Sequence, residues 1–246
     1  MPKTPHVVVL LFLTSLLVAG SLQTGCAKRE RSPGEIREAA NNAYARGDYA
    51  RSLAEWDEYA RVVDAPLVSD IGRGRALLAL ERPSEAVIPL ERVYRADPTS
   101  AEKLELLIEA LYGAGERERL IQLLQDRTRQ PGAVSDFLRL GQYAQMLGDP
   151  DEAQRALLAA ARVDRGQSFE PQFRLAEFYH TIGDTDRALE RYAMALWFDY
   201  SNEQVADRIR ALGETPGRTY VKVPHEAIQE GLLPADAPPP DPRPRG

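Results

Sequence analysis

Cysteine, histidine and tryptophan are scarce in this chain of 246 residues, which contains one, three and two of them respectively. A single cysteine excludes an internal disulfide and any cysteine-rich metal site. Three histidines, one of them in an apolar N-terminal segment, are too few for a histidine cluster that binds a metal ion. The sequence also contains no phosphate-binding glycine loop, no HExxH and no Gly-x-Ser-x-Gly motif. We therefore expect a protein that is not an enzyme and that uses no cofactor and no metal.

An excess of basic residues is missing as well, because 31 Lys and Arg stand against 37 Asp and Glu, for a net charge of −6. Binding to a phosphate backbone needs clustered Lys and Arg, so nucleic acid is not the expected partner. No alternating apolar pattern runs long enough to build a sheet. The composition therefore predicts a helical protein without a nucleic-acid partner or a small-molecule substrate.

A helix–turn–helix pattern recurs along the chain and is clearest between Phe169 and Asn202. Apolar residues three and four apart mark one face of each of two helices, and the turn between them carries Gly183-Asp184. The small residue at position 20 of this unit is Ala188, and its equivalents recur at intervals of 33 to 35 residues, at Ser52, Ala86, Leu120 and Ala153. A constant period favours repeated helix pairs over an irregular all-helical domain.

This pattern resembles the tetratricopeptide repeat, a helix–turn–helix unit of about 34 residues. The phase gives five units, at residues 33–66, 67–100, 101–133, 134–168 and 169–202. A further amphipathic helix over residues 203–213 is expected to cover the last apolar face. The resemblance implies an all-α fold, a right-handed superhelical solenoid of five tetratricopeptide-like helix–turn–helix repeats with a C-terminal capping helix. The third unit fits worst, since Arg127 occupies a position where a small residue is expected.

Local signals mark where the helices begin and end. Ser32 and Glu35 form the capping-box pattern of a helix start, and Ser201 with Gln204 does the same for the capping helix. The turn within each unit carries a glycine in four of five cases, and the second unit has Glu81 there instead.

Residues 1–25 have the features of a bacterial signal peptide. The apolar run from Val7 to Ala19 is too short to span a bilayer but suits a signal-peptide core. The stretch that ends at Cys26 resembles a lipobox, in which the cysteine becomes lipid-modified and N-terminal, although Gln23 replaces the usual leucine. Ordinary cleavage after Ala27 is the alternative. We expect a lipidated Cys26, a tether over residues 26–32, and a position in the cell envelope on the periplasmic side of a membrane. The absence of an aspartate after the cysteine favours the outer membrane over the inner membrane.

The C-terminal residues 214–246 are rich in proline and are predicted to be mostly disordered. Within them, the stretch from Tyr220 to Leu233 is apolar enough to dock locally, with Pro224 ahead of a short helix over Ala227 to Leu232.

The first helices of the units line a concave surface in tetratricopeptide-repeat proteins. The resemblance therefore implies a partner-binding groove, formed here by sixteen residues of the first helices: Arg37, Asn41, Tyr44, Arg75, Leu78, Glu102, Glu105, Glu109, Tyr112, Leu138, Arg139, Gln142, Phe173, Arg174, Glu177 and His180. Three of them, the glutamates of the third unit, share one helical face beside a tyrosine, which favours a basic segment as ligand. The alternative is a solvated acidic stripe that binds nothing.

These features together predict a membrane-anchored periplasmic scaffold that binds a peptide or partner protein in its groove. The architecture resembles outer-membrane assembly lipoproteins and pilus-assembly pilotins, which join a lipidated cysteine to five or six such repeats. A role in outer-membrane, pilus or secretion assembly is the corresponding expectation. A structural spacer, or an accessory factor of a cell-envelope enzyme complex, is the alternative.

Overall fold

The structure is a computed structural model that describes residues 31–129, 132–217 and 219–240. The predicted signal peptide and the predicted lipidation site at Cys26 lie outside the described residues. Within those ranges all regular secondary structure is helical and no strand occurs. None of the described helices has the length and apolarity that a bilayer crossing requires.

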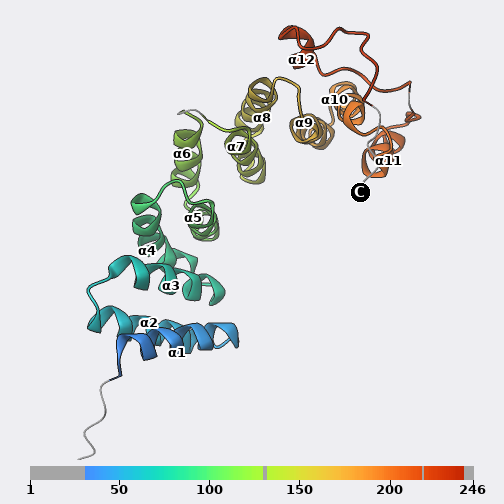
Figure 1. The fold of residues 1–246 in the computed structure, drawn as a ribbon. Helices are drawn as coiled ribbons and strands as arrows, with labels where there is room; N and C mark the ends of the chain where they lie inside the picture. Colours follow the sequence, from blue (N-terminus) through green and yellow to red (C-terminus); the bar gives the residue numbers. More distant parts are fainter. Residues whose placement is uncertain (1–30, 130–131, 218, 241–246) are drawn as a thin grey trace, which may run out of the picture.

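Ten of the described helices form five consecutive pairs. The pairs are α1 (Pro33–Ala45) with α2 (Tyr49–Val62), α3 (Pro66–Ala79) with α4 (Pro83–Ala96), α5 (Ala101–Gly113) with α6 (Arg117–Thr128), α7 (Val134–Met146) with α8 (Pro150–Asp164), and α9 (Phe169–Thr181) with α10 (Thr185–Phe198). Helix α11 (Glu203–Ala211) packs on α10 as the cap, and the short α12 (His225–Gln229) follows. Figure 1 shows the pairs stacked into an arc, with α3, α5, α7 and α9 on its inner side. The predicted all-α solenoid of five repeats with a capping helix is confirmed.

The close packing within a unit depends on a small residue opposite a large one. A Cβ atom added to Gly141 of α7 would lie 2.7 Å from the Leu157 side chain of α8. The same holds in the second unit, where a Cβ atom on Gly74 would lie 2.4 Å from Leu90. Distances below 3 Å mean steric overlap. Each leucine therefore occupies the space that a side chain at the glycine position would need.

The third unit departs from this pattern. Its three usual small positions hold Ile108, Leu120 and Arg127, and the first two are fully buried together with Leu124. Large side chains on both helices keep the two backbones apart, and α5 and α6 approach one another less closely than the helices of any other pair. The poor fit of this unit to the repeat pattern thus has a structural counterpart, a widened helix pair.

Arg127 has a structural role in this widened unit. Its guanidinium pairs with Asp136 at the start of α7, with Nε 2.8 Å from Oδ1, and its Nη1 donates to the carbonyl oxygen of Pro98 at 2.9 Å and to the Tyr94 hydroxyl at 3.3 Å. The side chain therefore joins α6 to α4, to the loop before α5 and to α7. A long polar side chain can replace a small one here because it bridges the gap between helices.

The turns within the units follow the glycine pattern. The four turn glycines have φ angles between 73° and 80°, and Glu81 occupies the corresponding place in the second unit with φ of 56°. The capping box of Ser32 and Glu35 is present at the start of α1. The capping box predicted for Ser201 is wrong, because the side chain of Asn202, one residue later, accepts from the amide of Val205 at 3.2 Å.

The C-terminal segment is packed on the last repeat. Residues 219–233, here called the strap, include α12 and pack on α10 and on the loop between α8 and α9. The strap coincides with the stretch from Tyr220 to Leu233 that was expected to dock locally within the tail, and Val223 and Ala227 are buried there. The short helix also begins two residues before the predicted one, directly after Pro224. Burial of apolar side chains and of one ion pair, described below, holds this stretch against the last repeat.

Candidate functional site: the concave groove

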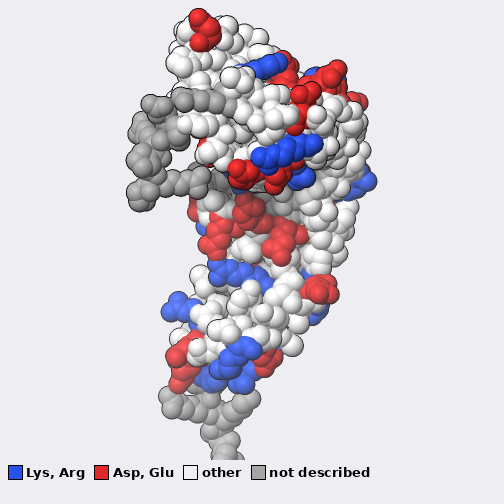
Figure 2. Space-filling model, turned by 90° about the vertical axis from the view of Figure 1, so that its right-hand side faces the viewer, with Lys and Arg blue, Asp and Glu red and all other residues white. Residues whose placement is uncertain are grey.

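The inner face of the arc is hollowed and strongly charged. Figure 2 shows this face, with acidic side chains gathered in the hollow at mid-height and basic side chains above and below them. Helix α5 lies at the centre of the arc and carries Glu102, Glu105 and Glu109, all exposed. The groove therefore combines a central acidic region with basic flanks.

Ion pairs cross the groove from helix to helix. Arg75 of α3 pairs with Glu102 of α5, and Arg139 of α7 pairs with Glu105 of α5. These pairs offset the repulsion between neighbouring glutamates. A bound partner is therefore not needed to relieve that repulsion. Exposed pairs of this kind contribute about 0–1 kcal/mol each, and their main effect is to occupy two of the three carboxylates.

Glu109 is the carboxylate of this stripe that remains available. None of the ion pairs between described residues involves it. One helical turn further, Tyr112 is 41% exposed, and its ring meets the ring of Tyr143 of α7 edge to face at 5.7 Å between centroids. Burial and the nearby charge of Glu105 raise the pKa of Tyr143 above its usual range. Met146, half exposed, lies one turn beyond Tyr143 on α7.

The chemistry of this end of the groove suits a cation with an apolar stem. A carboxylate attracts the charge, tyrosine faces attract Lys or Arg through cation–π interactions, and a methionine adapts to varied apolar shapes. We call Glu109, Tyr112, Tyr143 and Met146 the tyrosine cluster. Sequence reasoning missed Tyr143, because it follows the inner position of its unit by one residue and no repeat pattern marks it.

A cleft of about 260 Å³ adjoins the tyrosine cluster at Tyr143 and extends toward the first turns of α7 and α9. It is lined by eight residues of α5, α7 and α9: Glu105, Ser135, Leu138, Arg139, Gln142, Tyr143, Glu170 and Arg174. Besides Glu105, four of these were predicted to line the groove, namely Leu138, Arg139, Gln142 and Arg174. The structure thus brings predicted residues from three consecutive units to one depression.

Several predicted groove residues serve the core instead. Phe173 is only 8% exposed, with its ring stacked on Phe169 at 5.2 Å and tilted against Tyr192 at 6.2 Å. Its prediction as a groove residue is corrected, because an aromatic ring on α9 buries more apolar area between the helices than in the open groove. Leu78 and Leu138 are partly buried against the core clusters as well.

Glu177 and His180 of α9 belong to a polar network rather than to an open surface. Nδ1 of His180 lies 3.2 Å from the Tyr192 hydroxyl, which donates to Glu177, and Arg208 of α11 pairs with Glu177 at 3.1 Å. Burial, followed by this hydrogen bond, raises the pKa of Tyr192. The network fixes α11 against α9, so these two side chains stabilise the cap.

The first unit contributes an exposed end to the groove. Arg37 and Asn41 of α1 are exposed, and Tyr44, 38% exposed, contacts Tyr49 with ring centroids 5.1 Å apart. These residues lie at the opposite end of the arc from α9 (Figure 1). A ligand that reached both ends would therefore have to be extended.

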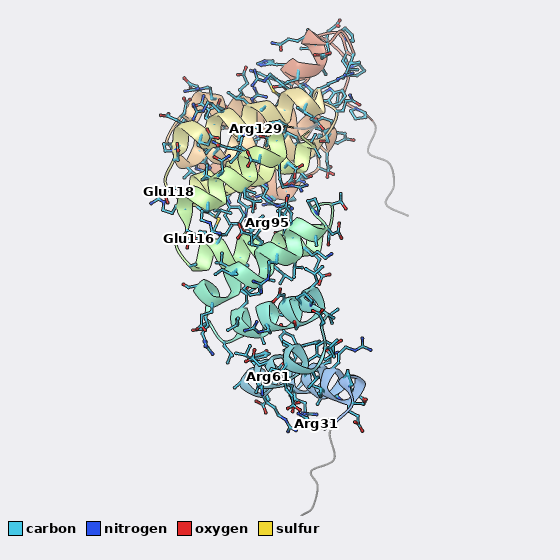
Figure 3. The ribbon with its side chains drawn as sticks, turned by 90° about the vertical axis from the view of Figure 1, so that its left-hand side faces the viewer. Arg31, Arg61, Arg95, Glu116, Glu118 and Arg129 are labelled. Carbon is cyan, nitrogen blue, oxygen red and sulfur yellow. The ribbon has the colours of Figure 1, made fainter. Side chains whose placement is uncertain are left out.

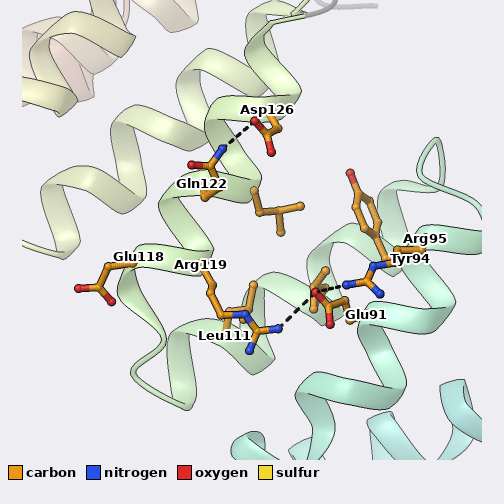
Figure 4. Close-up of a pocket in the computed structure, with 10 residues that line it drawn as sticks. Glu91, Tyr94, Arg95, Leu111, Glu118, Arg119, Gln122 and Asp126 are labelled. Carbon is orange, nitrogen blue, oxygen red and sulfur yellow. Dashed lines mark hydrogen bonds and ion pairs between the residues drawn. The ribbon is translucent and has the colours of Figure 1, made fainter.

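The outer side of the third unit carries a second depression. Figure 3 shows this side of the molecule, with Arg95, Glu116, Glu118 and Arg129 around the third unit. The widened gap between α4, α5 and α6 holds a cleft of about 500 Å³. Figure 4 shows Glu91 at its edge, paired with Arg95 at 2.9 Å and with Arg119 at 3.2 Å. Its charged groups largely neutralise one another, so it offers no clear preference for a ligand.

Metal binding finds no support in the described ranges. No group of three or more His, Cys, Asp and Glu there is placed to hold a metal ion.

The sequence profile described as the tetratricopeptide repeat matches residues 37–101 and 138–202, more than half of the chain. The chain belongs to the tetratricopeptide-repeat family. The profile does not match the third unit, which is the unit with the widened helix pair. Tetratricopeptide-repeat proteins are generally scaffolds that bind protein or peptide partners, and membership of the family indicates a protein–protein interaction scaffold.

Several solved structures are similar to this chain, among them those of MamA, YrrB and TTC0263. The MamA protein is 17% identical, with a TM-score of 0.52 over 73% of this chain and 94% of MamA. YrrB, whose structure is described as having an unusual peptide-binding site, is 17% identical, with a TM-score of 0.50 over 73% of this chain and 92% of YrrB. A thermophilic tetratricopeptide-repeat protein of Thermus thermophilus, TTC0263, is 21% identical, with a TM-score of 0.45 over 74% and 98% of the two chains. No curated protein sequence matches the chain.

Proposed function

We propose that this tetratricopeptide-repeat protein is a membrane-anchored scaffold of the cell envelope that binds a basic segment of a partner protein in its concave groove. The observation that carries the ligand chemistry is Glu109, a groove carboxylate that forms no ion pair with another described residue, beside the rings of Tyr112 and Tyr143. The other two glutamates of the stripe have arginine partners within the chain. The tyrosine cluster is therefore the place where a Lys or Arg of the partner gains most.

The membrane anchor is a separate part of the proposal and depends on Cys26 and the apolar segment before it. Acyl chains on that cysteine would hold the repeats close to a membrane, because each buried CH₂ contributes about 0.8 kcal/mol. The periplasmic side, and the outer membrane in particular, follow from the same sequence features. The groove then faces partners that assemble in the envelope.

A comparison of charge-reversal variants tests the ligand chemistry. The protein is purified from solubilised membranes together with its bound partners, as the wild type and as Glu109→Lys. Glu118→Lys is the matched control, because Glu118 is an exposed glutamate on the outer side of the third unit (Figure 3). We expect Glu109→Lys to bind at least about tenfold more weakly a partner that Glu118→Lys binds as the wild type does. A tenfold loss of affinity corresponds to about 1.4 kcal/mol in binding free energy.

Salt dependence and an aromatic variant complete the test. Capture by the wild type should fall as the salt concentration rises, and Tyr112→Ala should weaken capture without changing this salt dependence. Equal capture by the wild type and by Glu109→Lys, with unchanged thermal unfolding, would show that the acidic stripe binds nothing.

A further inference from the structure

The C-terminal half of helix α10 is buried on all sides, unlike the other second helices of the units. Seven consecutive residues, Arg191 to Trp197, are buried, and they cover every direction around the helix. In the equivalent helix α8 the buried residues are spaced three and four apart, at Ala153, Ala156, Leu157 and Ala160 among others, and leave the outer face open. The outer face of this C-terminal half of α10 is therefore an apolar surface that requires a cover.

The strap provides that cover. Figure 1 shows it crossing the outer side of the arc beside α10 before it reaches α12. The amide of Lys222 donates to the carbonyl oxygen of Ala193 at 3.0 Å, and Tyr220 and Val221 pack against the core cluster of the last two units. Gly166, between α8 and α9, leaves room for α12, since a Cβ atom there would lie 2.8 Å from the amide nitrogen of Ala227. An extended segment followed by a short helix thus fits this surface.

A buried polar site fixes the register of the strap. Nη1 of Arg191 donates to Oε1 of Glu226 at 2.8 Å and to Oε1 of Gln172 at 2.7 Å, and Nε2 of Gln172 donates to Oε2 of Glu226 at 2.9 Å. Glu226 is 6% exposed and Gln172 is fully buried. Arg191 and Gln172 belong to the repeats. A segment that covers them must supply a carboxylate, because a buried cation and a buried amide without partners are unfavourable.

The strap covers this surface only in part. A cleft of about 640 Å³ remains between α10 and the strap, lined on the α10 side by Asp186, Arg187, Leu189, Glu190 and Ala193. Helix α12 has five residues, too few to be stable without its contacts. The cleft is open to solvent along the edge of the strap, and the short helix has no stability of its own, so a segment that fills the cleft better can replace the strap.

We propose that the outer face of α10 is a second peptide-binding surface, which the chain's own strap occupies and which accepts a segment of the same pattern from a partner. The pattern is an extended apolar stretch followed by a carboxylate that reaches Arg191 and Gln172. This surface lies on the outer side of the arc, away from the concave groove, and the inference does not depend on the ligand of the groove. Specificity comes from the buried arginine, because a segment without the carboxylate would leave its charge unpaired.

The strap itself is the probe. A fluorescein-labelled peptide with the sequence of residues 219–233 is titrated against the full-length chain and against the Glu226→Arg variant, whose strap is repelled by Arg191. We expect the variant to bind the peptide at least about tenfold more tightly than the wild type, in which the attached strap competes. Glu230→Arg is the matched control, an exposed glutamate one residue beyond α12, and should behave as the wild type.

A charge exchange tests the recognition of the carboxylate. The peptide carrying the Glu226→Arg change should fail to bind the Glu226→Arg chain but should bind a chain carrying Arg191→Glu. Equal affinity of the unchanged peptide for the wild type and for the Glu226→Arg chain would overturn the proposal. It would also be overturned if the unchanged peptide and the Glu226→Arg peptide bound equally well to the Glu226→Arg chain and to the Arg191→Glu chain.

Hydrogen exchange of the unaltered chain gives a readout that needs no variant. The Lys222 amide, bonded to α10, should exchange at least about a hundredfold faster than the amides in the middle of α9, because the strap opens while the repeats stay folded. Exchange of Lys222 as slow as that of α9 would mean that the strap opens only when the repeat unfolds, and the surface would then not be exchangeable.

Discussion

Gly141 of α7 lies directly against Leu157 of α8, so that a Cβ atom on the glycine would be 2.7 Å from the leucine side chain. A side chain at position 141 must therefore push the two helices apart. We expect Gly141→Val to lower the free energy of unfolding by about 1–3 kcal/mol. Gly217 is the control, since nothing lies within 4 Å of its Cβ position, and Gly217→Ala should change it by less than about 0.5 kcal/mol. Urea unfolding followed by circular dichroism measures both, and equal stability of the two variants would contradict this packing.

In the widened third unit, Leu120 is a large residue at a position where the repeat usually has a small one. The other units have Ala or Ser at this position, yet Leu120 is fully buried between α5 and α6. Leu120→Ala, which restores the family pattern, should destabilise the protein by about 2–5 kcal/mol because it leaves a cavity. Ala153→Leu in the fourth unit should also destabilise it, by about 1–3 kcal/mol, through overpacking. A third unit that gained stability from the alanine would show that its widened helix pair is not held by these side chains.

The fold was largely predictable because the same pattern of small and large residues recurs in most of the units. Small residues such as Ala153 and Ala188 recur at one period, and the glycines Gly74 and Gly141 each face a leucine of the partner helix. The third unit was predictable as an exception but not in its geometry, because the sequence does not reveal that Arg127 bridges three neighbouring segments. The docked strap was only partly predictable, since its ion pair joins residues 35 positions apart.

Glu81 is a non-glycine residue in the left-handed region, with φ of 56°. A side chain there costs roughly 1–2 kcal/mol, whereas glycine pays no steric cost and loses about 0.5–1 kcal/mol through its freer unfolded state. We expect Glu81→Gly to stabilise the protein by about 0.5–1 kcal/mol in thermal unfolding. Gly148→Ala, at the equivalent turn with φ of 77°, should destabilise it by a similar amount. Opposite signs for this pair are the diagnostic result.

The attachment of the strap should depend on pH. Burial by itself raises the pKa of Glu226, but the charge of Arg191 and the hydrogen bonds to the carboxylate outweigh it and hold the pKa below its usual range. A lowered pKa in the folded state means that the ionised carboxylate stabilises the strap at pH values above about 4.5, the ordinary value for Glu. That stabilisation is lost as the pH falls further through the folded-state pKa.

The signals of Lys222 and Ala193 in NMR spectra measured between pH 7 and pH 3 follow this release. Glu190, Lys222 and His225 also interact at the rim of the strap, so Glu190→Gln is the control for their contribution. We expect the transition to persist in Glu190→Gln and to disappear in Glu226→Gln, whose strap should be loosened at every pH. A transition unchanged in Glu226→Gln would assign the pH dependence to another group.

The anchor prediction concerns residues outside the described ranges. Cys26→Ser should release the protein into the soluble fraction or block its processing, because the acyl chains then have no attachment site. Fractionation of cells and mass spectrometry of the N-terminus test it. A wild-type protein that is fully soluble, with Lys28 as its first residue, would show ordinary signal-peptide cleavage after Ala27 instead.

The groove was predictable by position but not by pairing. Repeat numbering placed Glu102, Glu105 and Glu109 on one helical face, and α5 carries them at the centre of the groove. It gave no sign that Arg75 and Arg139 of the neighbouring units pair with the first two, because such contacts join separate helices. Whether an aromatic residue faces the groove or the core also depends on its neighbours, as the burial of Phe173 shows.

The widened third helix pair has a consequence for cooperativity. In a linear array each unit is coupled only to its neighbours, so the total stability is a sum of unit and interface contributions. Helix α6 buries only two side chains completely, and it is the last helix of a core cluster centred on α3 to α6, after which a second cluster centred on α7 to α11 begins. The weakest coupling therefore falls at the middle of the array. Denaturant should divide the protein there into two folding blocks that melt in separate steps, each with a denaturant dependence close to half that of the whole chain.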